Sequence, residues 1–72
     1  MQPLIYEVRF DAGRWVVRLD GATLFSFAAR EEAVQRADDL AIVGAAGRDL
    51  QIHLYDEAGV LQQRLTARDY DI

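Results

Sequence analysis

Residues 13–21 constrain the fold more than any other part of the chain, because they read as one strand with a turn signal at each end. A glycine opens the stretch, an Asp-Gly pair closes it, and the only tryptophan of the chain lies between them. Successive side chains of a strand point to opposite faces of a sheet. One face carries Trp15, Val17 and Leu19, and the other carries Arg14, Val16 and Arg18. We expect the first face to be core and the second to be an outer surface.

Two neighbouring segments alternate in the same way and extend this strand into a meander. Residues 4–10 alternate apolar and polar side chains, which is typical of a half-buried strand. The Asp-Ala-Gly sequence at residues 11–13 is a short loop that folds the chain back as a hairpin. The Asp-Gly pair at residues 20–21 is the strongest hairpin signal of the chain, and it leads into a third strand at Ala22–Phe27.

The apolar spacing changes from 2 to 3.6 after residue 28, which predicts one amphipathic helix. Its apolar stripe consists of Ala33, Val34, Ala37, Leu40 and Ala41. Glu31 and Glu32 fall in the first turn, where they favour the positive end of the helix dipole, and Gly44 is a natural C-cap. The start is the weak point of this helix, because Ala28 and Ala29 offer no capping oxygen.

Two more strands follow the helix, at Leu50–Tyr55 and at residues 60–66, with a turn between them. In the last strand we expect Leu61 and Leu65 to face the core, and Gln62, Arg64 and Thr66 to face outward. Residues 67–72 are expected to be a frayed tail. The sequence thus predicts a single small domain over residues 1–72, of the α+β class, with the order β-β-β-α-β-β. We expect a single antiparallel sheet with one helix packed across one face.

Composition limits the chemistry that the chain can support. The 72 residues include no cysteine, which excludes disulfides and thiolate metal sites. A chain this short buries only about 60% of its unfolded surface, so its core is thin and dimerisation is a natural source of added stability. The net charge of −4 argues against a generic nucleic-acid binder, although all eight basic residues are arginine. No apolar run approaches a membrane span and residues 1–5 do not read as a signal peptide, so we expect a cytoplasmic protein without a membrane partner.

Several short motifs resemble those of a known group of small bacterial proteins. They are Gly13-Arg14-Trp15-Val16-Val17-Arg18, then Glu32-Ala33, then Ile52-His53. Together they are similar to the YegP-like domains of unknown function, which have a G-x-W-x-V-[KR] strand, an E-A helix and a V-H strand. The chain departs from that pattern at Ala29, where the family usually has a capping threonine, and in its longer turn at residues 56–59. The resemblance implies no activity, because the family brings none with it.

No constellation of residues in the sequence indicates catalysis. The single histidine, His53, has no cysteine or lysine to work with and only one serine in the chain. Alternation places the aromatic rings on the helix-facing side, so we expect core packing rather than a stacking platform. These rings belong to Tyr6, Phe10, Trp15, Phe25 and Phe27. We therefore predict a protein that is not an enzyme, with no catalytic residue, no metal site and no cofactor.

The outward sheet face is the candidate binding surface. Its candidate residues are Arg9, Arg14, Val16, Arg18, His53, Tyr55 and Arg64. A homodimer or protein-partner interface on this face, or at an edge strand, ranks first, and a plain solvated face ranks second. The alternative function is weak nucleic-acid or anionic-ligand binding through the arginines. A domain swap through the connector at residues 44–47 stays open as well.

Overall fold

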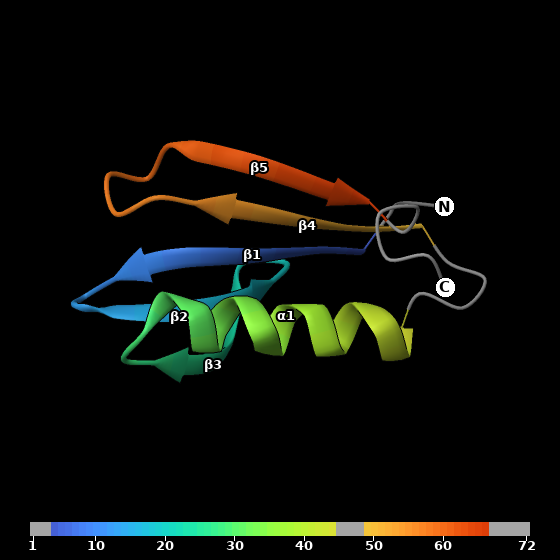
Figure 1. The fold of residues 1–72 in the computed structure, drawn as a ribbon, viewed down its shortest axis with the longest axis horizontal. Coiled ribbons are helices and arrows are strands. Elements are labelled where there is room, and N and C mark those ends of the chain that lie inside the picture. Colours follow the sequence, from blue (N-terminus) through green and yellow to red (C-terminus); the bar gives the residue numbers. More distant parts are fainter. Residues whose placement is uncertain (1–3, 45–48, 67–72) are drawn as a thin grey trace.

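The computed structural model of the protein describes residues 4–44 and 49–66. They form five strands and one helix in the expected order, which confirms the α+β class (Figure 1). The strands are β1 (Leu4–Asp11), β2 (Arg14–Leu19), β3 (Ala22–Phe27), β4 (Leu50–Tyr55) and β5 (Leu61–Thr66), and the helix is α1 (Arg30–Gly44). The tail expected at residues 67–72 and most of the connector at residues 44–47 lie outside the described residues.

The strands form one mixed sheet in the order β3-β2-β1-β4-β5. β1 pairs in parallel with β4, while the other three pairs are antiparallel. The prediction of a purely antiparallel sheet was therefore wrong. The reason is the helix: α1 carries the chain back along the sheet, so that β4 starts from the same end as β3 and β1 (Figure 1). Parallel neighbours need such a crossover connection, and a helix is the usual one.

The core lies between α1 and the three central strands. Ala33, Ala37 and Ala41 are fully buried on the sheet-facing side of α1. Beneath them lie Val8, Val17, Leu50 and Ile52, which are the largest fully buried side chains. Three alanines at i, i+4 and i+8 form one helical stripe, and their small side chains let the helix approach the sheet closely. The stripe expected from the sequence is the packing face of the helix.

The aromatic residues occupy the helix side as expected, but not all of them are buried. Tyr6 and Trp15 belong to the core, and Phe25 and Phe27 are half-buried against it. Phe10 is 37% exposed and lies against Trp15, with 5.1 Å between the ring centroids. Its place at the end of β1 beside the hairpin explains this exposure, since α1 does not extend over it.

Both early hairpins turn through residues with positive φ. Ala12 and Gly13 have φ of 50° and 81°, and Asp20 and Gly21 have φ of 52° and 80°. Two consecutive positive φ values define the type I′ turn, whose twist matches that of the flanking strands. The Asp-Gly hairpin expected at residues 20–21 is thereby confirmed.

A bulge in β5 overturns the expectations that Leu61 faces the core and that Gln62 faces outward, since Gln62 lines a hollow with Trp15 and Arg30 on the helix side. Leu54 pairs with Gln63, whereas Tyr55 pairs with Leu61, so Gln62 is an extra residue in the ladder. An extra residue reverses the face of the residues on one side of it. Leu61 consequently shares a face with Tyr55 and is 39% exposed, while Leu65 packs against the core as expected.

The burial of Ile52 can be tested by removing one methylene group. Ile52 is fully buried on β4, so we expect Ile52→Val to lower the free energy of unfolding by about 0.5–1.5 kcal/mol. Urea unfolding followed by Trp15 fluorescence measures this loss. Ile42→Val removes the same group from a side chain that is 54% exposed on α1, and it should change stability by less than about 0.5 kcal/mol. Equal losses in the two variants would contradict the assignment of Ile52 to the core.

Candidate functional site

The candidate surface lies on the sheet face that α1 does not cover, which we call the open face (Figure 1). The strand registers bring the candidate residues together as expected. Arg9 is opposite Val16 across β1 and β2, and His53 is opposite Arg64 across β4 and β5. Glu7 lies between the two groups, because it is opposite Arg18 on one side and His53 on the other.

Val16 does not offer the exposed apolar area expected of it. It is only 5% exposed, although no helix lies on its face. Arg18 explains this burial, because its Nη2 reaches Asp11 Oδ2 at 3.0 Å. Asp11 is opposite Arg14, four register positions from the Arg18 pair, so the Arg18 side chain extends over Val16, which lies between Arg14 and Arg18. The aliphatic part of an arginine readily covers apolar surface in this way.

Arg14 and Arg18 also bind the hydroxyl groups of β3. Arg14 Nε donates to Ser26 Oγ at 2.7 Å, and Arg18 Nε donates to Thr23 Oγ1 at 3.3 Å. Ser26 carries the nearest hydroxyl before α1, and this hydroxyl accepts from Arg14 on the neighbouring strand. The two arginines thus hold β3 to β2 from the open side.

Arg9 belongs to a second cluster, on β1 and β4. Its guanidinium lies over the ring of Tyr55 at 4.0 Å, and its Nε is 3.5 Å from Glu7 Oε1. Tyr55 completes the cluster by donating from its hydroxyl to Glu7 Oε2 at 3.2 Å. The ion pair of Glu7 therefore runs along β1 to Arg9, and not across to Arg18, its register partner on β2. These contacts place the guanidinium on the Tyr55 ring, and the Glu7 carboxylate offsets part of its charge.

His53 interacts with the polar side chains of Gln51, Arg64 and Glu7. Its Nε2 lies 2.9 Å from Gln51 Oε1 on the same strand. Burial lowers the pKa of His53 below its ordinary value of 6.5, the nearby charge of Arg64 lowers it further, and Glu7 opposes the shift. Among the described residues, no group of three His, Cys, Asp or Glu side chains is arranged to hold a metal ion.

Of the large apolar side chains that are exposed among the described residues, three lie at the edges of the sheet, and the others are Phe10 at the first hairpin and Ile42 and Val43 on α1. Leu24 is 45% exposed on β3, Leu61 is 39% exposed on β5, and Val60 beside β5 is 55% exposed. β3 and β5 are the two edge strands of the sheet. Leu24 is itself an extra residue in its strand, since Val17 pairs with Phe25 and Arg18 with Thr23. Alternation alone could not place Leu61, because the bulge that exposes it has no clear sequence signature.

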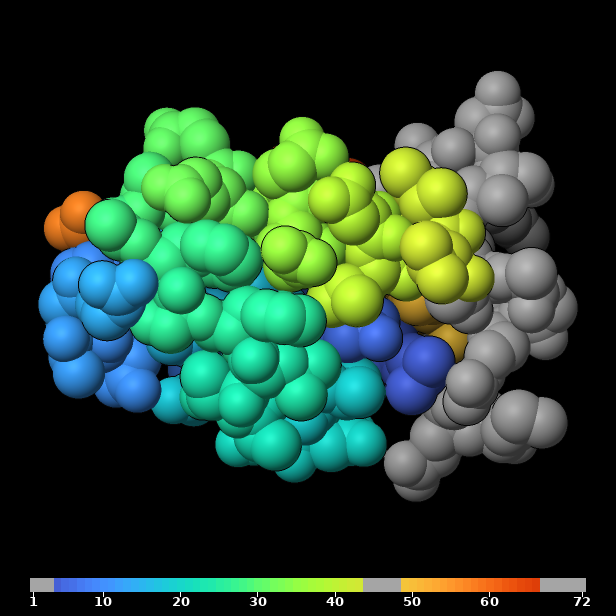
Figure 2. All heavy atoms as spheres, turned by 90° about the horizontal axis from the view of Figure 1, so that it is seen from below, coloured from blue at the N-terminus to red at the C-terminus, as the bar shows by residue number. Residues whose placement is uncertain are grey.

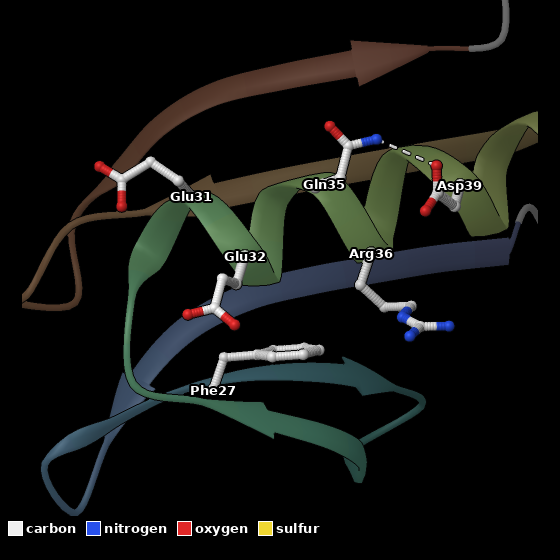
Figure 3. Close-up of a pocket in the computed structure, with 6 residues that line it drawn as sticks. All are labelled: Phe27, Glu31, Glu32, Gln35, Arg36 and Asp39. Atoms are coloured by element: carbon white, nitrogen blue, oxygen red, sulfur yellow. Dashed lines mark hydrogen bonds between the residues drawn. The ribbon is translucent and has the colours of Figure 1, made fainter.

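Two hollows that are lined by described residues lie on the helix side. One is lined by Trp15, Arg30, Asp56, Glu57 and Gln62, with the Arg30 guanidinium 5.7 Å from the Trp15 ring centroid. The other is lined by Phe27, Glu31, Glu32, Gln35, Arg36 and Asp39, between β3 and α1 (Figure 3). Neither hollow is predicted from the sequence, because each joins residues of elements that only the fold brings together.

Asp56 organises the turn beside the first hollow. Its Oδ1 accepts from the backbone N–H groups of Ala58 and Val60 at 2.9 Å, and its Oδ2 accepts from Gln62 at 2.8 Å. The pKa of Asp56 is lowered, first of all by the hydrogen bond from Val60. These bonds account for the carboxylate as a structural group of the β4–β5 turn.

Comparison with models of protein families found no match, and comparisons with curated proteins and with solved structures found no match either. No helix of residues 4–44 and 49–66 is long and apolar enough to cross a membrane.

The environment of His53 predicts opposite effects of two substitutions. We expect its pKa to lie below 6.5, to rise when Arg64→Gln removes a neighbouring positive charge, and to fall when Glu7→Gln removes a negative one. Proton NMR measures each value directly, because the protein has a single histidine. Shifts of the same sign in both variants would contradict the arrangement of charges around His53.

The turn carboxylate predicts a pH dependence of stability. The folded-state pKa of Asp56 is below its ordinary value of 3.8, so its carboxylate stabilises the fold above about pH 3.8. That contribution is lost as the pH falls from there through the folded-state pKa. We expect Asp56→Asn to be less stable at neutral pH and to lose less stability on acidification, as measured by urea unfolding at several pH values. Glu57→Gln removes a charge from the same turn and serves as the control, which should keep the wild-type slope.

Proposed function

We propose that the protein is a small non-enzymatic binding module that associates with a second copy of itself, or with another protein, through an edge of its sheet. The observation that carries this proposal is the location of exposed apolar side chains beside both edge strands. An edge strand presents unpaired backbone N–H and C=O groups, which add readily to a strand of another chain. We also propose that the chain is related to the YegP-like domains, and this relationship implies no activity.

The β5 edge is the better candidate for self-association. α1 packs on β1, β2, β3 and β4, so β5 extends beyond the helix. Val60 and Leu61 are exposed there. Pairing of β5 with β5 of a second copy across a two-fold axis would leave both helices away from the interface. The added strand would also bury apolar surface that a chain this small cannot cover by itself.

The centre of the open face supports binding less well than its sequence suggests. Val16 is buried, and Arg9, Arg14 and Arg18 are each engaged with neighbouring side chains. An interface needs exposed apolar area, and a phosphate site needs cations that are available. Weak nucleic-acid or anionic-ligand binding through the arginines of the open face therefore stays the alternative, and Arg64 is an exposed member of that set.

The mass in solution tests the proposal most directly. We expect light scattering behind a sizing column to give a dimer whose stability responds little to salt, because its contact is apolar and backbone-mediated. Leu61→Lys should shift the equilibrium to monomer by placing a charge at the β5 edge.

Two matched variants control for the added charge. Leu24→Lys places a lysine on the other edge strand, and Val43→Lys places one on α1 at a side chain that is 83% exposed. Both should leave the dimer intact. A monomer at every concentration, or an equal response of the three variants, would refute self-association through β5. Salt-sensitive binding of an oligonucleotide by a monomer would favour the alternative.

A further inference from the structure

β3 is an edge strand with little protection against pairing. It runs from Ala22 to Phe27 and contains no charged residue and no proline. Natural edge strands usually carry such residues or are covered by another segment. β3 has a bulge at Leu24, but residues 25–27 keep a regular register with β2. That regular part offers a backbone edge to which another strand can add.

No segment of the described residues occupies the outer side of β3. Among residues 4–44 and 49–66, no backbone hydrogen bond outside the helix and the sheet involves this strand. Arg14 Nη2 approaches the Ser26 carbonyl only at 3.5 Å, which is a long contact. Figure 2 views the molecule from the β3 side and shows β3 at the surface with α1 directly beside it. An added strand would therefore lie next to β3 and to the flank of α1.

Two phenylalanine side chains give this edge an aromatic strip on the helix side. Phe25 and Phe27 pair with Val17 and Trp15, which both belong to the core beneath α1. The two phenylalanines are half-buried, and their rings stack with 6.4 Å between the centroids. Each of them thus keeps exposed surface on an edge strand.

Two opposite charges on α1 lie above this aromatic strip. The Arg36 guanidinium is 4.8 Å from the Phe25 ring centroid. Glu32 lines a hollow together with Phe27, and Figure 3 shows Glu32 and Arg36 on the flank of α1 that faces β3. Four residues of a helix rise about 6 Å and two residues of a strand about 6.6 Å, so the two charges repeat the spacing of the two rings. Neither charge is part of an ion pair within the described residues.

This arrangement of rings and charges is complementary to itself. In an antiparallel pair of β3 strands with Ser26 opposite Ser26, Phe25 of each copy is opposite Phe27 of the other. The two-fold axis at such a joint also reverses the order of the charges on the neighbouring helix, so Glu32 of each copy is directed toward Arg36 of the other. Two aromatic cross-strand pairs and two pairs of opposite charges would form together.

We propose that the β3 edge binds the β3 edge of a second copy, in antiparallel register about Ser26. A segment whose side chains on the helix side are all basic or all acidic is a poorer occupant, because it meets one like charge for every opposite charge. A second copy supplies both charges in the matching order. Its phenylalanine side chains also cover the exposed part of the aromatic strip.

The β3 contact goes beyond the proposed function, because it uses the opposite edge of the sheet and does not depend on the β5 contact. Only three residues of β3 keep the regular register, so the β3 contact is expected to be the weaker of the two. Two different two-fold contacts at opposite edges leave a free edge at each end, so they build an open row of molecules and not a closed ring. Dimers joined at β5 would therefore associate through β3 as the concentration rises.

Sedimentation velocity of a Leu61→Lys variant isolates the β3 contact, because the added lysine blocks pairing at β5. We expect this variant to dimerise reversibly as its concentration rises, and less strongly at high salt, since the charges involved are exposed. Adding Glu32→Arg should raise the dissociation constant roughly tenfold, because two attractive charge pairs become repulsive. Glu31→Arg is the matched control, since it makes the same change in the same helical turn on the side of α1 away from β3 (Figure 3). It should dimerise as its parent does.

Mixing two charge-reversal variants separates loss of the contact from loss of folding. Glu32→Arg leaves two basic side chains on the flank of α1 that faces β3, and Arg36→Glu leaves two acidic ones. Each variant alone, in the Leu61→Lys background, should dimerise weakly, whereas an equimolar mixture should recover the dissociation constant of the parent. No recovery in the mixture, or equal weakening by Glu31→Arg, would overturn the proposal.

A cysteine cross-link tests the register. The chain has no cysteine, so Ser26→Cys places a single thiol opposite its own copy, where cross-strand Cβ atoms lie about 4.5–5.5 Å apart, near the separation that a disulfide needs. Oxidised glutathione should convert this variant to a disulfide-linked dimer on a non-reducing gel. Thr23→Cys, on the same strand, should stay largely monomeric, and equal cross-linking of both variants would contradict the register.

The β3 and β5 proposals fail separately. A wild-type dimer that Leu61→Lys abolishes at every concentration would refute the β3 contact and leave the β5 contact standing. A wild-type dimer that Glu32→Arg abolishes and Leu61→Lys does not would refute the β5 contact and support the β3 contact.

Discussion

The close packing of α1 on the central strands is the interaction on which the rest of the structure depends. Ala33, Ala37 and Ala41 have no exposed surface, and they place the helix over β1, β2 and β4. A stripe of small residues brings the helix axis near the sheet, but it also covers only a narrow width. The five strands are wider than one helix can cover. The position of α1 therefore determines that β3 is flanked by the helix and that β5 is not.

A layer of polar side chains takes the place of a second helix on the open face. Arg18 extends over Val16 to Asp11, and Arg9 lies on Tyr55 beside Glu7. Exposed ion pairs of this kind contribute little to stability one by one, roughly 0–1 kcal/mol each. The aliphatic parts of the arginine side chains still exclude water from the strand beneath. This explains how Val16 is only 5% exposed without a second layer of secondary structure.

The sequence predicts most of the elements of this fold because local physics sets them. Alternation places Trp15 and Val17 toward the helix, and the Asp-Gly pair at residues 20–21 forms its turn by accepting positive φ. The direction of β4 cannot be predicted in this way, because it depends on the end of the sheet to which α1 returns the chain, and no local residue determines that end. β4 lies beside β1, so β1 is hydrogen-bonded to a strand on each side.

The candidate site was predictable in its membership but not in its contacts. Period 2 correctly gathers Arg9, Arg14 and Arg18 on one face, since it needs only the alternation of each strand. Whether those arginines are available depends on side-chain reach across strands, as in the contact of Arg18 with Asp11. The bulges at Leu24 and Gln62 are also tertiary features, and they alter which side chains face which side. The edges thus carry information that alternation cannot supply.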